Sequence, residues 1–462
     1  MVEKNAPSAD RIALVGECMI ARPWSQITVP GFDEVLGLMR SAATTYAHLE
    51  TVIGRPDEVD SAKSSDWLGS YMIADPAMAG ELAWAGIDLV SAASNHSCDF
   101  GQGGIRSTVA HCRKAGLLCA GIGTDLEAAR APAYADGPGG RVALVSLSSG
   151  NKSYEIAGMS KGGVPARGGV NPLRIKTLHE IPPQAAEQLK AIGGALKILR
   201  NGGEGGPAAV GLEPGEFRFA LPADQSTRSQ NAFVVGDDYA TRNVCNERDL
   251  AANLRAVEEA RDGADLVLVA HHFNISDGVR GDEPPNFVRD FAHAAIEAGA
   301  DVFIGHGWHR TMGIEIYRNR PIIYGIGNFI AHSEFMSVVP YDSYEAWGHE
   351  VDRLPTLGPN LRPLHPGLDG PSETWWSSAV IEVELAHGKP SALRLTPVEL
   401  GREVSADAPV TRPVGRQRYT DGRPVLARGE SARAVLERFA RLSRPLGTLL
   451  NIEGDIGRIS CV

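Results

Sequence analysis

The alternation of short apolar runs with helix-like segments is the feature that most restricts how this chain can fold. Residues 12–15 and 266–269 have the length and apolar composition of buried β-strands. Segments with helical spacing lie between such runs, for example residues 104–115, where Gly116 follows as a helix-ending residue. Alternating strands and helices predict an α/β fold in which helices cover the faces of a sheet.

The same pattern extends along most of the chain. We expect strands at residues 12–15, 87–90, 142–147, 266–269, 302–304 and 322–324, and helices at 79–85, 104–115, 250–261 and 287–298. Residues 379–400 alternate in polarity and predict edge strands, and residues 431–442 predict a surface helix.

At 462 residues the chain is about three times the length of a typical domain. We predict a single domain over residues 1–462 whose core occupies about 11–149 and 250–331. Two stretches rich in glycine, proline or tryptophan, at about 150–248 and 332–378, predict loop insertions over one face. Residues 379–462 would then add the edge strands and the last helix to this core.

Charge and composition exclude several classes of protein. The net charge is −11, from 45 Lys and Arg against 56 Asp and Glu, which disfavours nucleic-acid binding. No apolar run approaches the ~20 residues that span a bilayer, and the polar residues 1–10 lack the pattern of a secretory signal. The six cysteines form no CxxC pair. We therefore expect a cytoplasmic protein with reduced thiols that acts on a small molecule, without nucleic-acid or membrane partners.

Polar side chains with metal-binding chemistry follow several of the predicted strands. They are Glu17, His48, Glu50, Asn95, His272, His306 and His309. Because ligand sites in α/β sheets lie beyond the carboxyl ends of strands, we expect these residues at one rim. Carboxylate, amide and imidazole groups together suit a divalent ion. Two such ions about 3.5–4 Å apart can clamp a scissile group and activate a water.

Taken singly, these residues have ordinary structural explanations. A histidine after a strand often only hydrogen-bonds a loop, Asn95-His96 is typical of a turn, and Glu17 can lie near a helix start. Their coincidence at successive strand ends favours a metal site instead. His271 directly precedes His272, and neighbours that leave a strand point to opposite sides, so only one of the two is expected to face the metals.

The same residues stand in motifs that resemble the CapA-like family. The matching segments are Val15-Gly16-Glu17-Cys18-Met19, His48-Leu49-Glu50-Thr51, Asn95-His96-Ser97-Cys98-Asp99-Phe100-Gly101, Gly305-His306-Gly307-Trp308-His309 and Gly325-Ile326-Gly327-Asn328-Phe329. Family members are often labelled poly-γ-glutamate capsule synthesis proteins and belong to the calcineurin-like metallophosphatase superfamily. The resemblance covers about residues 11–149 and 250–331.

This resemblance implies a fold and a set of roles. The implied fold is a metallophosphatase-like β-sandwich flanked by helices, with loop insertions over the metal rim. Asn95, His272 and His306 would bind one divalent ion and His309 the other, the ions being Mn, Fe or Zn. His96 would be a general acid or support a ligand from behind.

Asp99 belongs to the same motif as His96, and we place both in the catalytic group. The chain also departs from the family, which usually has Asp in place of Glu17 and Asn in place of His48. Both residues can still bind metal, so these departures imply an altered metal spacing or preference and a different substrate.

These features predict a metal-dependent hydrolase that uses water activated by a binuclear centre on an ester, amide or phosphoester of a small molecule. His96 would protonate the leaving group. Two alternatives stay open, namely a role in poly-γ-glutamate capsule biosynthesis and a non-catalytic binding protein with a degenerate metal site.

The aromatic residues of 332–378 predict part of a substrate pocket, since this segment begins at the expected metal rim. They are Phe335, Tyr341, Tyr344, Trp347, Trp375 and Trp376. Aromatic walls with a few polar groups are typical of small-molecule pockets. The alternative is a surface loop whose tryptophans pack on the core.

Overall fold

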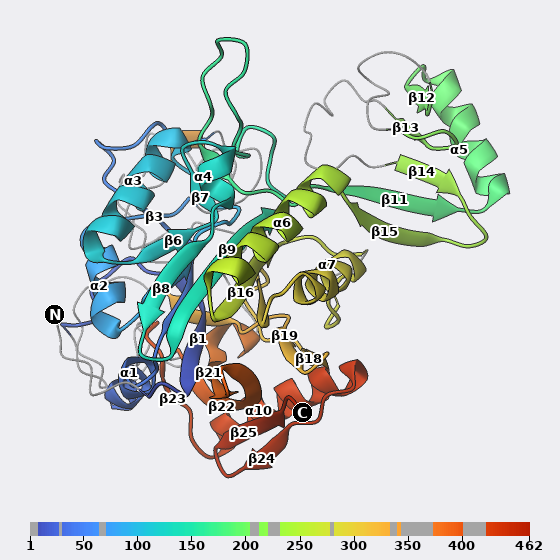
Figure 1. Cartoon of the computed structure of the whole chain (residues 1–462). Helices are drawn as coiled ribbons and strands as arrows, with labels where there is room; N and C mark the ends of the chain where they lie inside the picture. Colours follow the sequence, from blue (N-terminus) through green and yellow to red (C-terminus); the bar gives the residue numbers. More distant parts are fainter. Residues whose placement is uncertain are drawn as a thin grey trace.

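The fold is a sandwich of two β-sheets with helices on its outer faces, as the computed structural model shows (Figure 1). The structure describes residues 8–26, 30–63, 71–203, 212–219, 232–277, 281–332, 340–342, 373–400 and 422–462. The helix-flanked sandwich that the family resemblance implies is thereby confirmed.

The first sheet has ten strands, and its centre is the long strand β1 (Arg11–Met19). The strands lie in the order β24 (Asn451–Glu453), β25 (Ile456–Ser460), β22 (Lys389–Glu399), β21 (Ser377–Ala386), β1, β2 (Thr45–Leu49), β5 (Leu89–Ser91) and β6 (Leu118–Ala120), while β20 (Asn328–Ala331) also pairs with β1 and β23 (Val425–Leu426) with β22. Strands β1, β2, β5 and β6 run parallel to one another.

The prediction of edge strands at 379–400 is wrong. Strand β21 pairs with β1 on one side and β22 on the other, and β22 pairs further with β25. The two strands are therefore interior, and their inward residues Val383 and Leu393 are fully buried. Alternating polarity indicates that one face of a strand is solvated, but it does not indicate how many strands pair with it. The prediction therefore failed on the position of these strands in the sheet.

The second sheet has six strands, and its inner neighbours are parallel. The order is β18 (Ile314–Tyr317), β19 (Arg320–Ile323), β17 (Val302–His306), β16 (Leu266–Phe273), β9 (Gly140–Ser149) and β8 (Ala133–Gly137). One apolar cluster contains Leu14 and Leu89 from the first sheet together with Leu268 and Ile304 from the second. The two sheets therefore face each other across a shared core.

Helices bury apolar stripes against the outer faces of both sheets. On the first sheet these are α1 (Phe32–Arg40), α2 (Ala77–Ala85) and α3 (Gly101–Ala115), and on the second α6 (Glu247–Gly263) and α7 (Asn286–Glu297). Helix α10 (Glu430–Ser443) adds Val435, Leu436 and Phe439 to the core between the sheets. The remaining short elements are β3 (Val52–Ile53), β4 (Ile73–Ala74), β7 (Ile122–Gly123), α4 (Leu126–Arg130), β10 (Gly169–Val170), η4 (Glu373–Trp376) and η5 (Arg444–Leu446).

The helix ends follow from local sequence. Gly86 ends α2 with φ of 100° and Gly116 ends α3 with φ of 84°, conformations that a residue with a Cβ rarely adopts. The Asn246 side chain accepts a hydrogen bond from the Asp249 N–H at the start of α6. These signals confirm the helices predicted at 79–85, 104–115 and 250–261.

The stretch 150–248, predicted to be irregular, contains a folded unit that we call the insertion lobe (residues 175–245). Its five-stranded sheet has the order β12 (Leu199–Asn201), β13 (Phe217–Phe219), β14 (Ala232–Val235), β11 (Ile175–Ile181) and β15 (Ala240–Cys245), and α5 (Pro183–Ala195) joins two of these strands. Figure 1 shows the lobe in green, projecting from one end of the sandwich. The lobe buries only small apolar clusters, around Leu178 and Phe217, so its strands have weak apolar patterns.

Two further expectations concern the whole chain. No helix in the described ranges has the length and apolar content needed to cross a membrane. All six cysteines are free thiols.

Candidate metal centre

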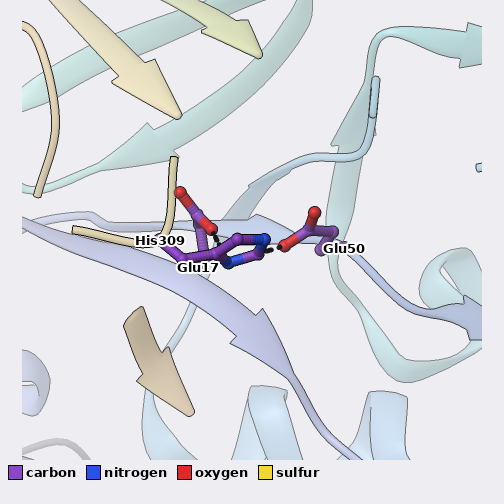
Figure 2. A group of neighbouring side chains, drawn as sticks. All are labelled: Glu17, Glu50 and His309. Atoms are coloured by element: carbon purple, nitrogen blue, oxygen red, sulfur yellow. Dashed lines mark ion pairs between the residues drawn. The ribbon is translucent and has the colours of Figure 1, made fainter. Parts of the chain in front are cut away.

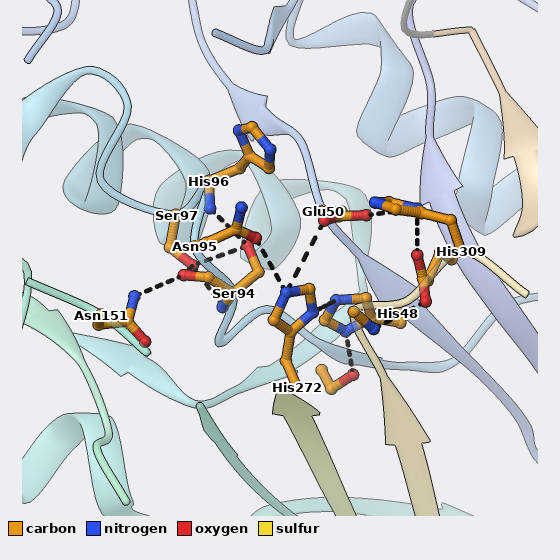
Figure 3. Close-up of polar contacts among 12 residues, drawn as sticks. His48, Glu50, Ser94, Asn95, His96, Ser97, Asn151, His272 and His309 are labelled. Carbon is orange, nitrogen blue, oxygen red and sulfur yellow. Dashed lines mark hydrogen bonds and ion pairs between the residues drawn. The ribbon is translucent and has the colours of Figure 1, made fainter. Parts of the chain in front are cut away.

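The seven predicted metal-binding residues lie at one rim of the sandwich. Glu17, His48, His272 and His306 occupy the carboxyl-terminal ends of β1, β2, β16 and β17. Glu50, Asn95 and His309 follow strands β2, β5 and β17 in the chain. Figure 3 shows His48, Glu50, Asn95, His272 and His309, which come from several strand ends, turned toward one another. The structure therefore brings together every residue of the predicted set.

Close backbone approach positions Glu17 at this rim. A Cβ at Gly16 would lie 1.8 Å from the Gly327 carbonyl oxygen, so only glycine allows β1 and the start of β20 to come this near. The Glu17 N–H donates to that carbonyl at 3.0 Å. The pairing of β1 with β2 shifts register between Leu14 and Glu17. Such bulges re-aim a side chain next to many active sites.

Glu17, Glu50 and His309 form the tightest cluster of the rim, with their ligand atoms within 4.8 Å of one another. Figure 2 shows the His309 imidazole between the two carboxylates. His309 Nδ1 lies 2.5 Å from Glu17 Oε2 and 3.7 Å from Glu50 Oε2. The residue has φ of 56°, a left-handed conformation that is uncommon without a functional reason.

Electrostatics couple these three residues. Burial alone would raise the pKa of Glu17, but the positive charge and hydrogen bond of His309 lower that pKa well below its usual value. Burial raises the pKa of Glu50 to about 7, against the opposing charge of His309. Both carboxylates in turn outweigh burial at His309 and raise its pKa to about 10. A proton on His309 thus occupies the space between two carboxylates, which is where a cation would be most stabilised.

Asn95 and His272 form a second group that shares Glu50 with the first. His272 Nε2 lies 2.9 Å from Asn95 Oδ1 and 3.8 Å from Glu50 Oε1. Asn95 therefore presents its amide oxygen, and His272 its ring nitrogen, toward the same side of Glu50 (Figure 3). Glu50 lies between the two groups as a shared carboxylate would.

His48 occupies a different position from the other predicted ligands. Its Nδ1 hydrogen-bonds Ser91 Oγ at 2.8 Å, and its Nε2 lies 2.9 Å from His272 Nδ1. Both ring nitrogens of His48 thus have protein partners. This geometry favours a role in orienting His272 from behind, as outer-shell partners of metal-binding histidines do.

His306 stacks on His48 with ring centroids 4.4 Å apart, and its Nε2 lies 2.8 Å from the Tyr46 hydroxyl. Its Nδ1 is buried and has no hydrogen-bond partner among the described residues. Burial lowers the pKa of His306 to about 3 and also lowers those of His48 and His272. The three imidazoles are therefore neutral near pH 7, the form that binds a metal.

The donor set fits divalent metal ions. Glu50 is only 1% exposed, and neither of its oxygens has a hydrogen-bond partner in the described part of the chain. A buried carboxylate without partners is costly unless a cation compensates it. Glu17, Glu50 and His309 would hold one ion, and Glu50, Asn95, His272 and His306 a second. Mixed carboxylate, amide and imidazole donors suit Mn, Fe or Zn.

His96 and Asp99 form a dyad beside this rim. His96 Nδ1 lies 2.7 Å from Asp99 Oδ2, and no described residue hydrogen-bonds its Nε2. Asp99 is fully buried and also pairs with Lys63 Nζ at 2.9 Å. Burial would raise the pKa of Asp99, but the charges of His96 and Lys63 lower it. Asp99 is thus placed to fix the orientation of the His96 imidazole.

Lys63 ties this dyad to the metal rim. Its ammonium donates to the Asn95 carbonyl and pairs with Glu155, each at 2.9 Å. Sequence reasoning missed Lys63 and Glu155, because each lies far in sequence from the motif it supports and neither stands at a strand end. It also assigned no role to Asn328, whose Oδ1 lies 2.9 Å from His309 Nδ1. The position of Asn328 at the start of β20 was the available signal.

His271 faces away from the rim, as the alternation of strand side chains predicts. Its Nε2 lies 2.8 Å from Ser149 Oγ, and its ring packs among Phe273, Phe287 and Phe291 on the helix side of the sheet.

The predicted pocket segment 332–378 is only partly within the described residues. Trp375 lies over the rim, with its ring centroid 4.5 Å from that of His309. Trp376 packs in an apolar cluster with Met19 and Met72, and Tyr341 is exposed. Phe335, Tyr344 and Trp347 lie outside the described residues. Among the three aromatic residues that the structure describes, Trp375 is the one that contacts the candidate metal centre.

A serine-nucleophile site finds no support here. Residues 158–162 match a G-x-S-x-G pattern around Ser160. That serine is exposed and directly precedes the turn that the pairing of Lys161 with Val164 closes, so it does not lie at a buried strand-to-helix elbow.

Comparison with known proteins adds a family context. The sequence family described as "Bacterial capsule synthesis protein PGA_cap" matches residues 11–333. A Sinorhizobium fredii protein named "Uncharacterized protein y4sH" is 29% identical over 463 residues, covering 98% of this chain and 94% of that relative. A Mycobacterium tuberculosis protein named "Probable polyglutamine synthesis accessory protein" is 28% identical over 262 residues, or 56% of this chain and 47% of the relative. The Bacillus subtilis "PGA biosynthesis protein CapA" is 39% identical over 75 residues, or 16% of this chain and 19% of the relative.

Proposed function

This chain belongs to the bacterial capsule synthesis protein PGA_cap family, and from that membership and the geometry of the rim we propose that it is a metal-dependent hydrolase. One observation carries the proposal. Glu50 is a buried carboxylate whose oxygens have no hydrogen-bond partner among the described residues, and it lies 3.7 Å from His309 on one side and 3.8 Å from His272 on the other. A carboxylate in that position suits a bridge between two cations.

Divalent ions held at such a rim lower the pKa of a coordinated water toward neutrality and polarise a scissile bond. The protein's own part is to orient the donors. Tyr46 and His48 fix the rings of His306 and His272, and the Gly307 N–H donates to Glu17 Oε1 at 2.8 Å. Trp375 covers His309 and limits the access of bulk water to that side.

His96 supplies the proton for the leaving group in this proposal. Asp99 accepts from His96 Nδ1, which leaves Nε2 as the atom that donates to a substrate. The buried Asp99 carboxylate holds the imidazole in this orientation, and the charge of Lys63 helps to keep the pKa of Asp99 low, so Asp99 stays ionised. The test of this step is His96→Gln, which should lower kcat and leave the metal content unchanged.

Activity after controlled metal loading tests the proposed function. The chelated protein is reloaded separately with Mn²⁺, Zn²⁺ and Fe²⁺ and assayed on p-nitrophenyl phosphate, p-nitrophenyl acetate and an N-acetyl-dipeptide p-nitroanilide. We expect turnover of at least one class that chelation removes and reloading restores. Absence of turnover with all three metals on all three classes would count against a hydrolase.

The names of the relatives support a second candidate, a part in building a polyglutamate capsule. The Bacillus subtilis relative carries that role in its name and matches this chain over 75 residues. In this candidate function the rim acts on, or holds, the polymer. Incubation of the metal-loaded protein with poly-γ-glutamate, followed by size-exclusion analysis, would show shortening or co-elution if it is correct.

A further inference from the structure

A cleft of about 820 Å³ lies where the insertion lobe meets the second sheet. Its walls come from the end of β9 and the segment after it, from the first residues of α6, and from strands β11 and β15 of the lobe. This volume is within the range of about 300–1,000 Å³ that small-molecule sites occupy. None of its lining residues comes from the described part of 332–378, where the sequence predicted the pocket.

The inner end of the cleft adjoins the candidate metal centre. Ser148, which lines the cleft, pairs with His272 in the register of β9 and β16, so their side chains share one face of the sheet. Asn151, also in the lining, donates from Nδ2 to the Ser94 carbonyl at 3.0 Å. Ser94 precedes Asn95, and Figure 3 shows Asn151 reaching this loop beside the rim.

The hydrogen bonds of Asn151 fix the orientation of its amide. Its Nδ2 lies 3.0 Å from the Ser94 carbonyl and 3.3 Å from Glu155 Oε2, and both of these partners can only accept. The nitrogen must therefore face them, which leaves Oδ1 on the other edge of the amide. That oxygen is buried and has no partner within the described ranges, and the same is true of Ser148 Oγ.

Two buried and unpartnered oxygens at the inner end of a cleft point to a ligand that fills them. Asn151 is 8% exposed and Ser148 is 1% exposed, so bulk water does not compensate either side chain. An unpartnered buried acceptor costs roughly 1–3 kcal/mol, so a ligand that satisfies it gains correspondingly. Asn151 Oδ1 can only accept, and its ligand must donate. An amide N–H provides that donor, whereas an ionised phosphoryl group offers only acceptors.

We propose that this cleft binds the chain of an amide substrate, with an N–H of the chain on Asn151 Oδ1 and Ser148 Oγ and the scissile group at the metal rim. This proposal rests on the proposed hydrolase function and narrows it from esters, amides and phosphoesters to amides. The insertion lobe then forms the outer wall of the substrate site. Asn151 and Ser148 act as specificity-determining residues.

A matched pair of serine variants tests the proposal. Ser148→Ala removes a hydroxyl that makes no hydrogen bond to the described protein, so the fold should tolerate it. Ser146→Ala is the control, because Ser146 lies two residues earlier on the same strand and face, is also buried without a hydroxyl partner, and does not line the cleft. The assays use the N-acetyl-dipeptide p-nitroanilide and p-nitrophenyl phosphate with metal-loaded protein.

We expect the wild type to prefer the anilide. Ser148→Ala should lower its kcat/KM by about tenfold, the effect of one lost hydrogen bond to a ligand. The activity of Ser148→Ala on the phosphate should change less than about twofold, and Ser146→Ala should match the wild type on both substrates, since it touches neither the cleft nor the rim. Equal losses on both substrates, or no loss in Ser148→Ala, would overturn the proposal.

A binding measurement separates this proposal from the hydrolase function itself. Hydrogen exchange at residues 148–157 is followed with and without N-acetyl-dialanine amide. Protection in the wild type that weakens in Ser148→Ala supports the cleft assignment even if the protein cleaves nothing, in which case only the hydrolase proposal fails. If the protein cleaves anilides but shows neither protection nor an effect of Ser148→Ala, the hydrolase proposal stands and the cleft proposal fails.

Discussion

Buried carboxylates are paired differently at the metal rim and at the insertion lobe. At the rim, Glu50 is buried between two histidines and neither of its oxygens has a hydrogen-bond partner among the described residues. At the base of the lobe, the buried carboxylate of Asp249 is paired with Arg174 at 2.6 Å and with Arg130 at 3.5 Å. Lys176 of β11 likewise pairs with Glu216. At this junction and within the lobe, Arg and Lys side chains pair closely with the buried carboxylates, whereas Glu50 at the rim has only His309 and His272, at 3.7 and 3.8 Å.

This difference distinguishes buried charges that stabilise the fold from buried charges that serve the proposed metal chemistry. A paired buried charge such as Asp249 secures two elements to each other. The Glu50 carboxylate has no hydrogen-bond partner among the described residues, and the positively charged His309 ring lies 3.7 Å from it. A buried carboxylate compensated this weakly lowers stability unless it binds a cation, so its presence requires a functional explanation. Variants of the rim and of the lobe test this difference.

The largest effect is expected for Glu50→Ala. Because Glu50 is placed to serve both candidate metal positions, its loss should remove most bound metal and lower kcat/KM by about 1,000-fold or more, in line with the loss of an essential charged group. The metal-free variant should also be at least as stable as the metal-free wild type, since it lacks a buried carboxylate. Thermal melts under chelation measure this, and a clear loss of stability would contradict the view that Glu50 is an uncompensated charge.

His272→Ala and His306→Ala should each abolish most turnover while the fold remains intact. Each removes one imidazole donor from the second group, and a wrong ligand set costs about 10–100-fold or more in affinity or activity. His387→Ala is the control, because His387 lies on an exposed turn between β21 and β22. Full activity in His272→Ala would refute its place among the ligands.

A smaller effect is expected for Asp99→Asn. The amide keeps the shape but removes the ionised acceptor of the His96 Nδ1–H, so His96 is held less firmly and kcat should fall by about 10–100-fold, as for other outer-shell partners. The KM and the metal content should stay within about twofold of the wild type, because Asp99 touches neither substrate nor ion. A matching fall in metal content would show that Asp99 supports the fold of the rim and not the proton transfer.

The smallest effect on the metal rim is expected for Phe217→Ala in the lobe. Phe217 is fully buried in β13, and removing it should destabilise the lobe by about 3–5 kcal/mol. Hydrogen exchange should quicken in residues 175–245 while the sandwich strands and the metal content are unchanged. If β1 and β16 also lose protection, the lobe and the sandwich unfold together, and the lobe is not an independent unit.

The sequence predicted the rim well because its residues obey a local rule. Glu17, His272 and His306 stand at the ends of apolar runs, and parallel strands bring such ends together whatever the loops do. The same rule does not predict which of these residues bind metal and which orient a ligand. His48 differs from His306 only in what its nitrogens touch, and those contacts depend on Ser91 and His272, which are distant in sequence.

The lobe and the C-terminal strands were harder to predict for a related reason. The strands of the lobe are short and half-buried, so their apolar pattern is weak, and glycines around them resemble loop sequence. Strand β22 has a clear pattern, but its pairing with β25 comes from residues more than fifty positions later. Local polarity predicts that a strand exists and does not predict its neighbours.

Elemental analysis of the purified protein measures whether the rim holds divalent metal. We expect about two transition-metal ions per chain in the wild type, as in two-metal hydrolase sites. We expect fewer than about one ion in Glu50→Ala, because that variant loses the shared ligand. The two proteins should be expressed and purified side by side, with His387→Ala as the matched control. A wild type without bound metal, which also fails to take up Mn²⁺, Zn²⁺ or Fe²⁺ on dialysis, would contradict the account.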